Sequence, residues 1–261
     1  MKIVFLTQDD PLYILPFFEE FFRQDLAGIE VSAIFTCKTM GDRSRVRLLK
    51  ELFHLYGPFG LFRLLLRAGT SKLLAKLPAG KNAKAFYSIA QVGRAFGAAH
   101  TLIGNPNKEE FRSQIESYSP DLLVSIACPY ILKDKLLNTP PLGCVNMHHA
   151  PLPRYKGMMP TFWQMYHGEK QVGITIHTMA ARVDEGQALL QEQLPIEEGE
   201  SLDHLIRRSK RHGAHCMAKV LHQLAAQSQT TLSLDNSLSS YFTFPTTTEM
   251  KEFRRRGFRA I

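Results

Sequence analysis

The sequence predicts an α/β fold built around a doubly wound, mostly parallel β-sheet. Short apolar runs at residues 2–7, 122–127 and 143–147 have the length and continuity of strands that are buried on both faces of a sheet. Segments with helical periodicity lie between these runs. Such an alternation is typical of doubly wound sheets, which bind their ligands at the carboxyl ends of the strands.

The start of the chain predicts a β-α-β unit. The run 2–7 is followed by a helical pattern of phenylalanine, leucine and isoleucine, with Pro11 in the first turn of the predicted helix. A second strand is predicted over 29–37, where Val31 and Phe35 share one face. We therefore expect two parallel strands joined by one covering helix.

The middle of the chain predicts the rest of the sheet. The strands 122–127 and 143–147 are followed by an alternating segment, 172–179, which is predicted to pair with 188–191. A helix over 201–223 has a clear start, because acidic residues precede it and lie in its first turn. Further helices are predicted over 132–137 and 161–167.

We expect a catalytic domain over residues 1–226 and a C-terminal extension over 227–261. A hydrophobic content of 44% in 261 residues is sufficient for a full core. The extension opens with a polar segment, 227–240, predicted to run along the surface, and 241–245 is predicted to return to the body. A basic terminal helix is predicted over 249–259.

The positive charge is concentrated in one segment. Ten lysines and arginines lie between Arg43 and Lys84 against a single acidic residue, Glu51, whereas the whole chain has a formal net charge of +8. The rest of the chain is therefore close to neutral, and a nucleic acid is not favoured as a partner.

This basic segment, 43–84, is predicted to be a helical insertion. Its leucines and phenylalanines are interleaved with cations, as in a helix that lies on an anionic bilayer. The alternative is a helical hairpin that packs its leucines on the body or on a second subunit, with the lysines in solvent. Both peripheral membrane contact and a homodimer are thus left open.

Two features of the chain predict a cytoplasmic location, either free or peripheral to the inner face of the membrane. The apolar run at 2–7 is too short for a signal peptide, and no apolar stretch is long enough to span a bilayer.

The four cysteines are far apart in the sequence and contain no C-x-x-C pair, which predicts free thiols and no zinc site. They are Cys37, Cys128, Cys144 and Cys216.

The segment 143–187 contains the residues best suited to catalysis. Asn146 and His148 are two positions apart in a predicted strand and share a face, whereas His149 points the other way. If Asp184 returns to meet them, an amide donor, an imidazole and a carboxylate can stabilise a tetrahedral oxyanion and move protons. Because no metal-binding motif is present, no metal is predicted.

The order and spacing of these residues resemble a known signature. The pattern is Asn146-x-His148-x-x-x-Leu152-Pro153, then Gly157-x-x-Pro160, Gly173-Ile174-Thr175-Ile176 and Val183-Asp184-x-Gly186. It is similar to that of the 10-formyltetrahydrofolate-dependent formyltransferases, which include glycinamide ribonucleotide, methionyl-tRNA and sugar-nucleotide N-formyltransferases. The resemblance covers about 118–215 and is weaker over the first third.

This resemblance implies a Rossmann-like formyltransferase fold and 10-formyltetrahydrofolate as the formyl donor. It implies that Asn146 and His148 stabilise the oxyanion, and that Asp184 orients His148 and assists proton transfer. It also implies a folate slot made mainly of backbone at 126–132 and 180–184. The residues assigned to it are Ile126, Cys128, Tyr130, Ile131, Leu132, Val183 and Asp184.

The acceptor site is assigned to two other segments. Asp9 and Asp10 follow the first strand, where they either bind the amine or hydroxyl groups of the acceptor or cap the first helix. The remaining assigned residues follow the catalytic strand: Arg154, Lys156, Gly157 and Met158.

Two segments outside the predicted catalytic residues reduce the number of possible acceptors. The turn 7–11 has two carboxylates and no glycine, so it is a poor phosphate site and glycinamide ribonucleotide is disfavoured. Methionyl-tRNA enzymes add a C-terminal β-barrel, whereas only 227–261 follows here, so tRNA is also disfavoured. An amino sugar, another small metabolite or a lipid-linked amine remains. The competing functions are a 10-formyltetrahydrofolate hydrolase and a non-catalytic module that binds a membrane or a partner.

Overall fold

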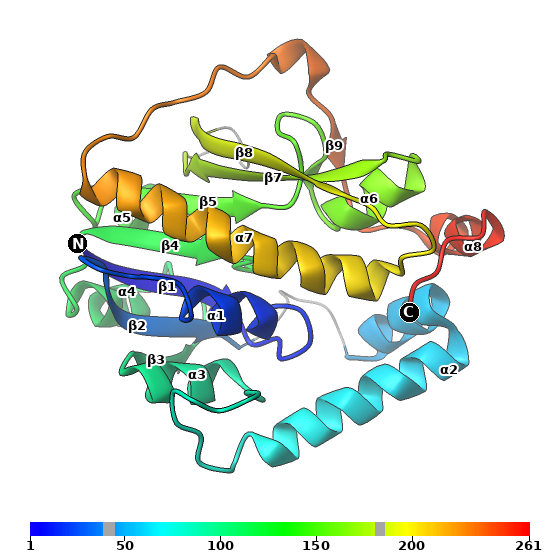
Figure 1. Ribbon diagram of the computed structural model, residues 1–261, viewed down its shortest axis with the longest axis horizontal. Helices are drawn as coiled ribbons and strands as arrows, with labels where there is room; N and C mark the ends of the chain where they lie inside the picture. The colour runs from blue at the N-terminus through cyan, green and yellow to red at the C-terminus, as the bar shows by residue number, and fades with distance from the viewer. Residues whose placement is uncertain (39–44, 181–185) are drawn as a thin grey trace.

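The computed structural model describes residues 1–38, 45–180 and 186–261. Its main sheet has the strand order β3-β2-β1-β4-β5-β7-β8 (Figure 1). The first five strands in this order are parallel, and β7 and β8 are antiparallel to their neighbours. The doubly wound, mostly parallel sheet is therefore confirmed. The strand bounds are β1 Lys2–Gln8, β2 Glu30–Cys37, β3 Ala99–Ile103, β4 Leu122–Ile126, β5 Cys144–His148, β7 Gln171–Thr178 and β8 Ala188–Pro195.

Helices cover both faces of the sheet. One face packs against α1, α3 and α7, and the other against α4 and α5. Phe5 of β1 lies in a cluster of edge-to-face rings with Phe17, Phe18 and Phe21 of α1, which makes this layer well packed. The bounds are α1 Leu15–Phe21, α3 Ile89–Phe96, α4 Glu109–Glu116, α5 Asp134–Leu137 and α7 Leu202–Ala225.

The first helix begins later than predicted. Residues 11–14 form turns, and α1 starts at Leu15 with Pro16, not Pro11, in its first turn. The reason lies in Asp10, whose Oδ1 accepts hydrogen bonds from the backbone N–H groups of Leu12 and Tyr13. These bonds hold a turn before the helix.

The terminal helix is also shifted from its prediction. It runs as α8 over Thr247–Arg255, with a capping box made by Thr246 and Glu249. It ends before Gly257, whose φ of 86° does not continue a helix.

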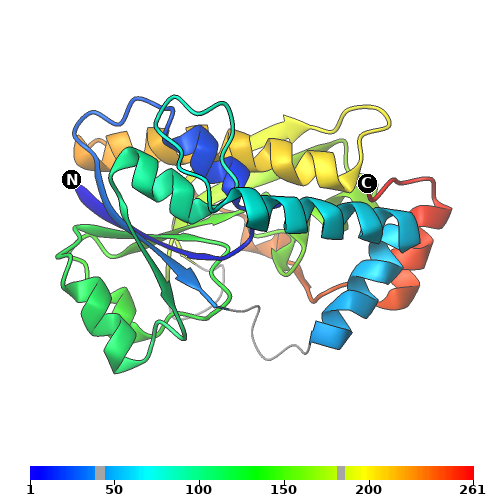
Figure 2. The ribbon, with the colours of Figure 1, turned by 90° about the horizontal axis from the view of Figure 1, so that it is seen from below.

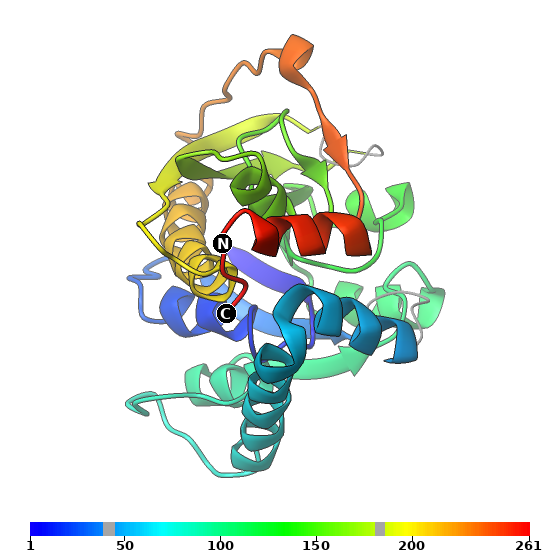
Figure 3. The ribbon, with the colours of Figure 1, turned by 90° about the vertical axis from the view of Figure 1, so that its right-hand side faces the viewer.

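The basic insertion is helical, as predicted. It forms α2, Arg45–Leu74, which is kinked where Gly57 adopts φ 70° and ψ 178° ahead of Pro58. We call residues 45–56 the first arm of α2 and residues 58–74 its second arm. Buried side chains of α2 pack with the C-terminal segment around α8. Figures 2 and 3 show both arms on the outside of the molecule, with α8 beside the first arm.

The C-terminal extension returns to the body as predicted. Its strand β9, Tyr241–Phe242, pairs in parallel with β6, Lys156–Gly157, directly after the predicted catalytic loop. The segment before it is mostly exposed and includes the short 3-10 helix η1, Asn236–Leu238. The helix α6, Pro160–Tyr166, packs in the same cluster as α8. The expected boundary at residue 226 falls at the end of α7, and the division into domains stays a prediction.

Candidate active site

Asn146 and His148 lie at the carboxyl end of β5 on one face of the sheet. The alternate residues of the strand, Val145 and Met147, turn to the opposite face and join the core under α7. His149 follows that opposite face, since a Cβ placed on Gly213 of α7 would lie 3.5 Å from its Cε1. The two-residue period of a strand thus places the predicted pair together and separates His149 from it.

The amide of Asn146 is oriented by a histidine of the neighbouring strand. Asn146 Nδ2 lies 3.2 Å from Nε2 of His177, its register partner on β7. His177 Nδ1 lies 2.8 Å from the carbonyl oxygen of Thr178, which can only accept, so Nδ1 carries the proton. Nε2 of the neutral ring is then an acceptor for one Asn146 N–H. The second N–H of this amide remains available for another acceptor.

His148 is held by a backbone carbonyl. Its Nε2 lies 2.8 Å from the oxygen of Tyr155, and the side chain is buried. Nε2 must therefore carry a hydrogen, and Nδ1 is the ring nitrogen that gains or loses the proton. The ring of Tyr155 stacks on Phe242, so the extension supports the carbonyl that orients His148.

The third predicted catalytic residue, Asp184, lies outside the described residues, and so does Val183 of the predicted folate slot. In the sequence, both residues lie between β7 and β8.

The other predicted folate residues lie at the end of β4, next to β5. Ser125 and Ile126 are the register partners of Asn146 and Met147. The chain turns at Ala127, which has φ 51°. Beyond it, Leu132 is buried, Cys128 and Tyr130 are partly buried, and Ile131 is 66% exposed. The loop after β4 thus brings backbone groups to the carboxyl ends of the strands, where Asn146 and His148 lie.

The predicted acceptor residues have structural contacts of their own. The carboxylate of Asp10 holds the turn before α1 and does not cap that helix, whose N-cap is Ile14 without a side-chain hydrogen bond, while Asp9 is exposed. Arg154 is paired with Glu169 and lies over the ring of Tyr155.

The other three acceptor residues sit at the β6–β9 contact. Lys156 and Gly157 form β6, and the N–H of Met158 donates to the oxygen of Phe242 at 2.8 Å. Gly157 has φ 94°, and a Cβ there would lie 2.3 Å from the same oxygen. Only glycine fits this close approach.

One buried charged side chain, near Asp10 and His149, was not predicted from the sequence. Lys210 of α7 is 8% exposed, and burial lowers its pKa to about 7 while Asp10 opposes this shift. Burial raises the pKa of Asp10. Burial and nearby Lys210 hold the pKa of His149 well below its usual value, and within the described part of the chain both ring nitrogens lack a hydrogen-bond partner. The burial of Lys210 could have been predicted, because this residue lies four residues from both Ile206 and Ala214, on the buried face of the helix.

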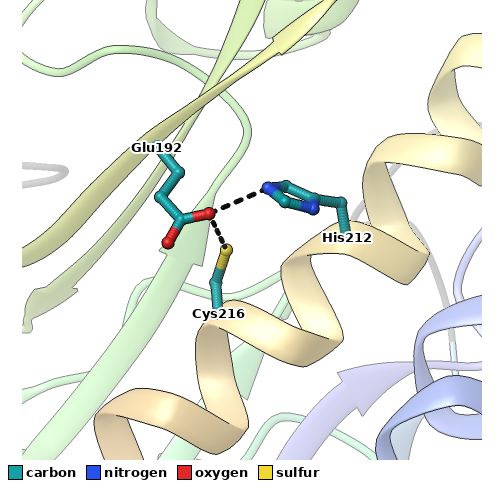
Figure 4. A group of neighbouring side chains, drawn as sticks. All are labelled: Glu192, His212 and Cys216. Atoms are coloured by element: carbon teal, nitrogen blue, oxygen red, sulfur yellow. Dashed lines mark hydrogen bonds and ion pairs between the residues drawn. The ribbon is translucent and has the colours of Figure 1, made fainter.

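Two clusters with metal-ligating side chains occur among the described residues, both outside the predicted site. In the first, Glu192 Oε2 of β8 lies 2.9 Å from His212 Nε2 and accepts from Cys216 Sγ at 3.5 Å (Figure 4). Lys219 Nζ lies 3.4 Å from the other oxygen of Glu192. Because this lysine already supplies a positive charge, we interpret the cluster as an ion-pair network between β8 and α7. The second cluster, 197–204, is similarly paired with Arg208.

Comparison with known proteins gives one family and a consistent set of folds. The formyl transferase family model matches residues 91–221, half of the chain. The methionyl-tRNA formyltransferase of Syntrophus aciditrophicus is 40% identical over 131 residues, which are 50% of this chain and 42% of that protein. The chain spans about half the length of the curated relatives it matches.

Two solved structures share the fold. Glycinamide ribonucleotide transformylase 1 from Symbiobacterium toebii has a TM-score of 0.59 at 17% identity, covering 90% of this chain and 94% of its own. The sugar 3N-formyl transferase WlaRD, determined in the presence of dTDP and 5-N-formyl-THF, has a TM-score of 0.56 at 14% identity, covering 100% of this chain and 82% of its own. At these identities the likeness shows the fold alone.

Proposed function

Because the chain belongs to the formyl transferase family, we propose that it is an N-formyltransferase. It moves the formyl group of 10-formyltetrahydrofolate to the amine of a small metabolite, an amino sugar or a lipid-linked acceptor. The observation that carries this proposal is the pair of polar side chains, Asn146 and His148, on one face at the end of β5.

The proposed chemistry follows from what these two side chains can donate. When the acceptor amine attacks the formyl carbon, a C–N bond forms and the carbonyl oxygen becomes an oxyanion. The second N–H of Asn146 donates to this oxyanion, and its direction is fixed by the bond to His177. His148 Nδ1, when protonated, donates a second hydrogen bond. The bond from the formyl carbon to N10 then breaks, and N10 takes a proton from His148.

Asp184 is proposed to complete the site. Its carboxylate orients His148 and favours the charged imidazole, and it takes the proton that the attacking amine loses. The net result is one C–N bond made, one broken and one proton moved from the amine to N10. The donor is proposed to bind at the loop after β4 and beside Val183 and Asp184.

The acceptor is proposed to bind near Asp9, Lys156 and Met158. A suitable panel contains amino sugars, sugar nucleotides, a cell lipid extract and glycinamide ribonucleotide. It also contains methionyl-tRNA, because the curated relatives are methionyl-tRNA formyltransferases.

The test is to incubate the protein with 10-formyltetrahydrofolate and this panel, and to seek a formyl mass gain on one acceptor. The gain is expected to vanish in His148→Ala. Formate release that needs no acceptor would instead identify a hydrolase. If neither product forms with any acceptor, the proposed transfer is wrong and the binding module is favoured.

A further inference from the structure

The second arm of α2 has an apolar stripe on its outer face. Phe59, Phe62, Leu66 and Leu73 follow one another at helical spacing and are 71%, 62%, 55% and 66% exposed. Leu65 lies beside them and is 51% exposed. We call these five residues the outer stripe. Large apolar side chains that line up in solvent in this way mark a binding surface.

The inner face of the second arm packs against the body of the protein. Leu64 is buried, and a Cβ on Gly60 would lie 3.0 Å from Ile261. Arg67 donates to the buried carboxylate of Asp203 at 2.9 Å. Because one side of the helix is fixed against the body, the outer stripe is not the side that folding covers. Packing on the body therefore leaves the outer stripe exposed, so that a bilayer and a second subunit are the two occupants to compare.

Cations border the outer stripe. Arg63, Lys72 and Lys76 are exposed, and none of them forms an ion pair with any residue in the ranges that the structure describes. Glu51 is the single acidic residue between Arg43 and Lys84. An apolar stripe with basic edges complements a surface that is apolar within and anionic at its boundary, as a lipid bilayer with acidic headgroups is.

A second copy of the chain fits this surface less well. In a two-fold dimer the same patch faces itself, so the lysines and arginines of one copy would lie against those of the other. No helix within the described residues is long and apolar enough to cross a membrane, so contact through α2 would be peripheral.

We propose that the outer stripe lies in the surface of an anionic bilayer and that the acceptor amine belongs to a lipid of that bilayer. The second part rests on the proposed formyl transfer, whereas the first does not. The arms of α2 border the end of the sheet toward which β4 and β5 run (Figure 1). Tyr56 of the first arm is tied to the same end, since its hydroxyl lies 2.7 Å from that of Tyr13. Bilayer contact thus holds the site near a membrane-anchored amine.

The test is sedimentation of the purified protein with vesicles of phosphatidylcholine alone or mixed with phosphatidylglycerol, at low and high salt. We expect binding to the anionic vesicles only, weakened by salt. Lys72→Gln and Lys76→Gln should each weaken it about fivefold. Replacing Leu65, Leu66 and Leu73 by glutamine, which preserves helix propensity, should weaken it at least about 100-fold.

A matched control replaces three leucines of similar exposure elsewhere: Leu102, Leu142 and Leu238, which are 45%, 51% and 55% exposed. This variant should bind as the wild type does. Absence of binding to anionic vesicles, or binding that survives the stripe variant, would overturn the proposal. A wild-type dimer that the stripe variant converts to a monomer, without vesicle binding, would identify a second copy as the occupant.

The proposed bilayer contact and the proposed formyl transfer can be contradicted by different results. If the stripe variant loses vesicle binding but transfers formyl groups to a soluble amine as fast as the wild type, the surface is confirmed independently of the site. If vesicle binding is intact and no acceptor is formylated, only the proposed function is wrong. A formyl mass gain found on a soluble amine and on no lipid would overturn the lipid acceptor.

Discussion

Asn146 Nδ2 and His177 Nε2 lie 3.2 Å apart across the β5–β7 pair, in a register that makes the two residues direct partners. Because Nδ1 of the histidine donates to a backbone carbonyl, the ring has one acceptor nitrogen, and that nitrogen receives the amide. The orientation of the proposed oxyanion donor is therefore set by a side chain on another strand. His177 is a positioning residue in this account.

His177→Ala should lower kcat by about tenfold with little change in the donor KM, because the amide of Asn146 loses its fixed direction but keeps its N–H groups. His177→Gln, which can also accept from the amide, should recover part of the loss. Steady-state kinetics of both variants check this. Equal losses in the two variants would mean that His177 acts in another way.

Lys210→Met should stabilise the protein near neutral pH. The folded-state pKa of Lys210 is lowered from 10.5 to about 7, so between these values the unfolded state binds more protons and stability rises with pH. Methionine removes this cost, which is at most about 5 kcal/mol below pH 7. Urea unfolding of both proteins at several pH values should show a gap that narrows toward pH 10. A gap that does not change with pH would contradict the assignment.

Gly157→Ala should detach the extension from the body. The new Cβ would meet the oxygen of Phe242 at 2.3 Å, and alanine is strained at φ 94°. We expect a loss of about 2 kcal/mol or more in the free energy of unfolding, together with faster proteolysis within 227–245. Gly199→Ala is the control, because it has φ 69° but nothing within 4 Å of its Cβ. Similar proteolysis of the two variants would show that the contact at Phe242 is unimportant.

Arg67→Met should loosen α2 from α7. Burial would raise the pKa of Asp203, but Arg67 and Arg207 together hold it below its usual value. The stability that this pairing contributes is fully present above the ordinary pKa of an aspartate, and it is lost as pH falls below that value toward the lowered pKa of the folded state. Removing one partner of a nearly buried carboxylate should cost about 1–3 kcal/mol at pH 7 and less at pH 3. Thermal unfolding at both pH values checks this prediction.

The sheet and the shared face of Asn146 and His148 could be predicted because their signals are local. Buried parallel strands appear as continuous apolar runs, and a strand period alone places Asn146 and His148 on one face. The strand and helices within 89–116 are less evident in the sequence. The edge strand β3 is mostly half-exposed, so its apolar residues do not form a run.

The polar contacts of the site could not be predicted, since they join distant segments. Lys210 meets Asp10 and His149 only because α7 packs beside the ends of β1 and β5. His177 reaches Asn146 through a strand register that no spacing in the sequence fixes. The role of Asp184 stays a prediction.

The central claim is that Asn146 and His148 carry formyl transfer, and single-turnover transfer from 10-formyltetrahydrofolate to the identified acceptor tests it most directly. Asn146→Ala should lower the rate on the order of 100- to 1000-fold, and His148→Ala at least as much, with both proteins folded as the wild type is. Transfer at a near-normal rate by either variant would contradict the account.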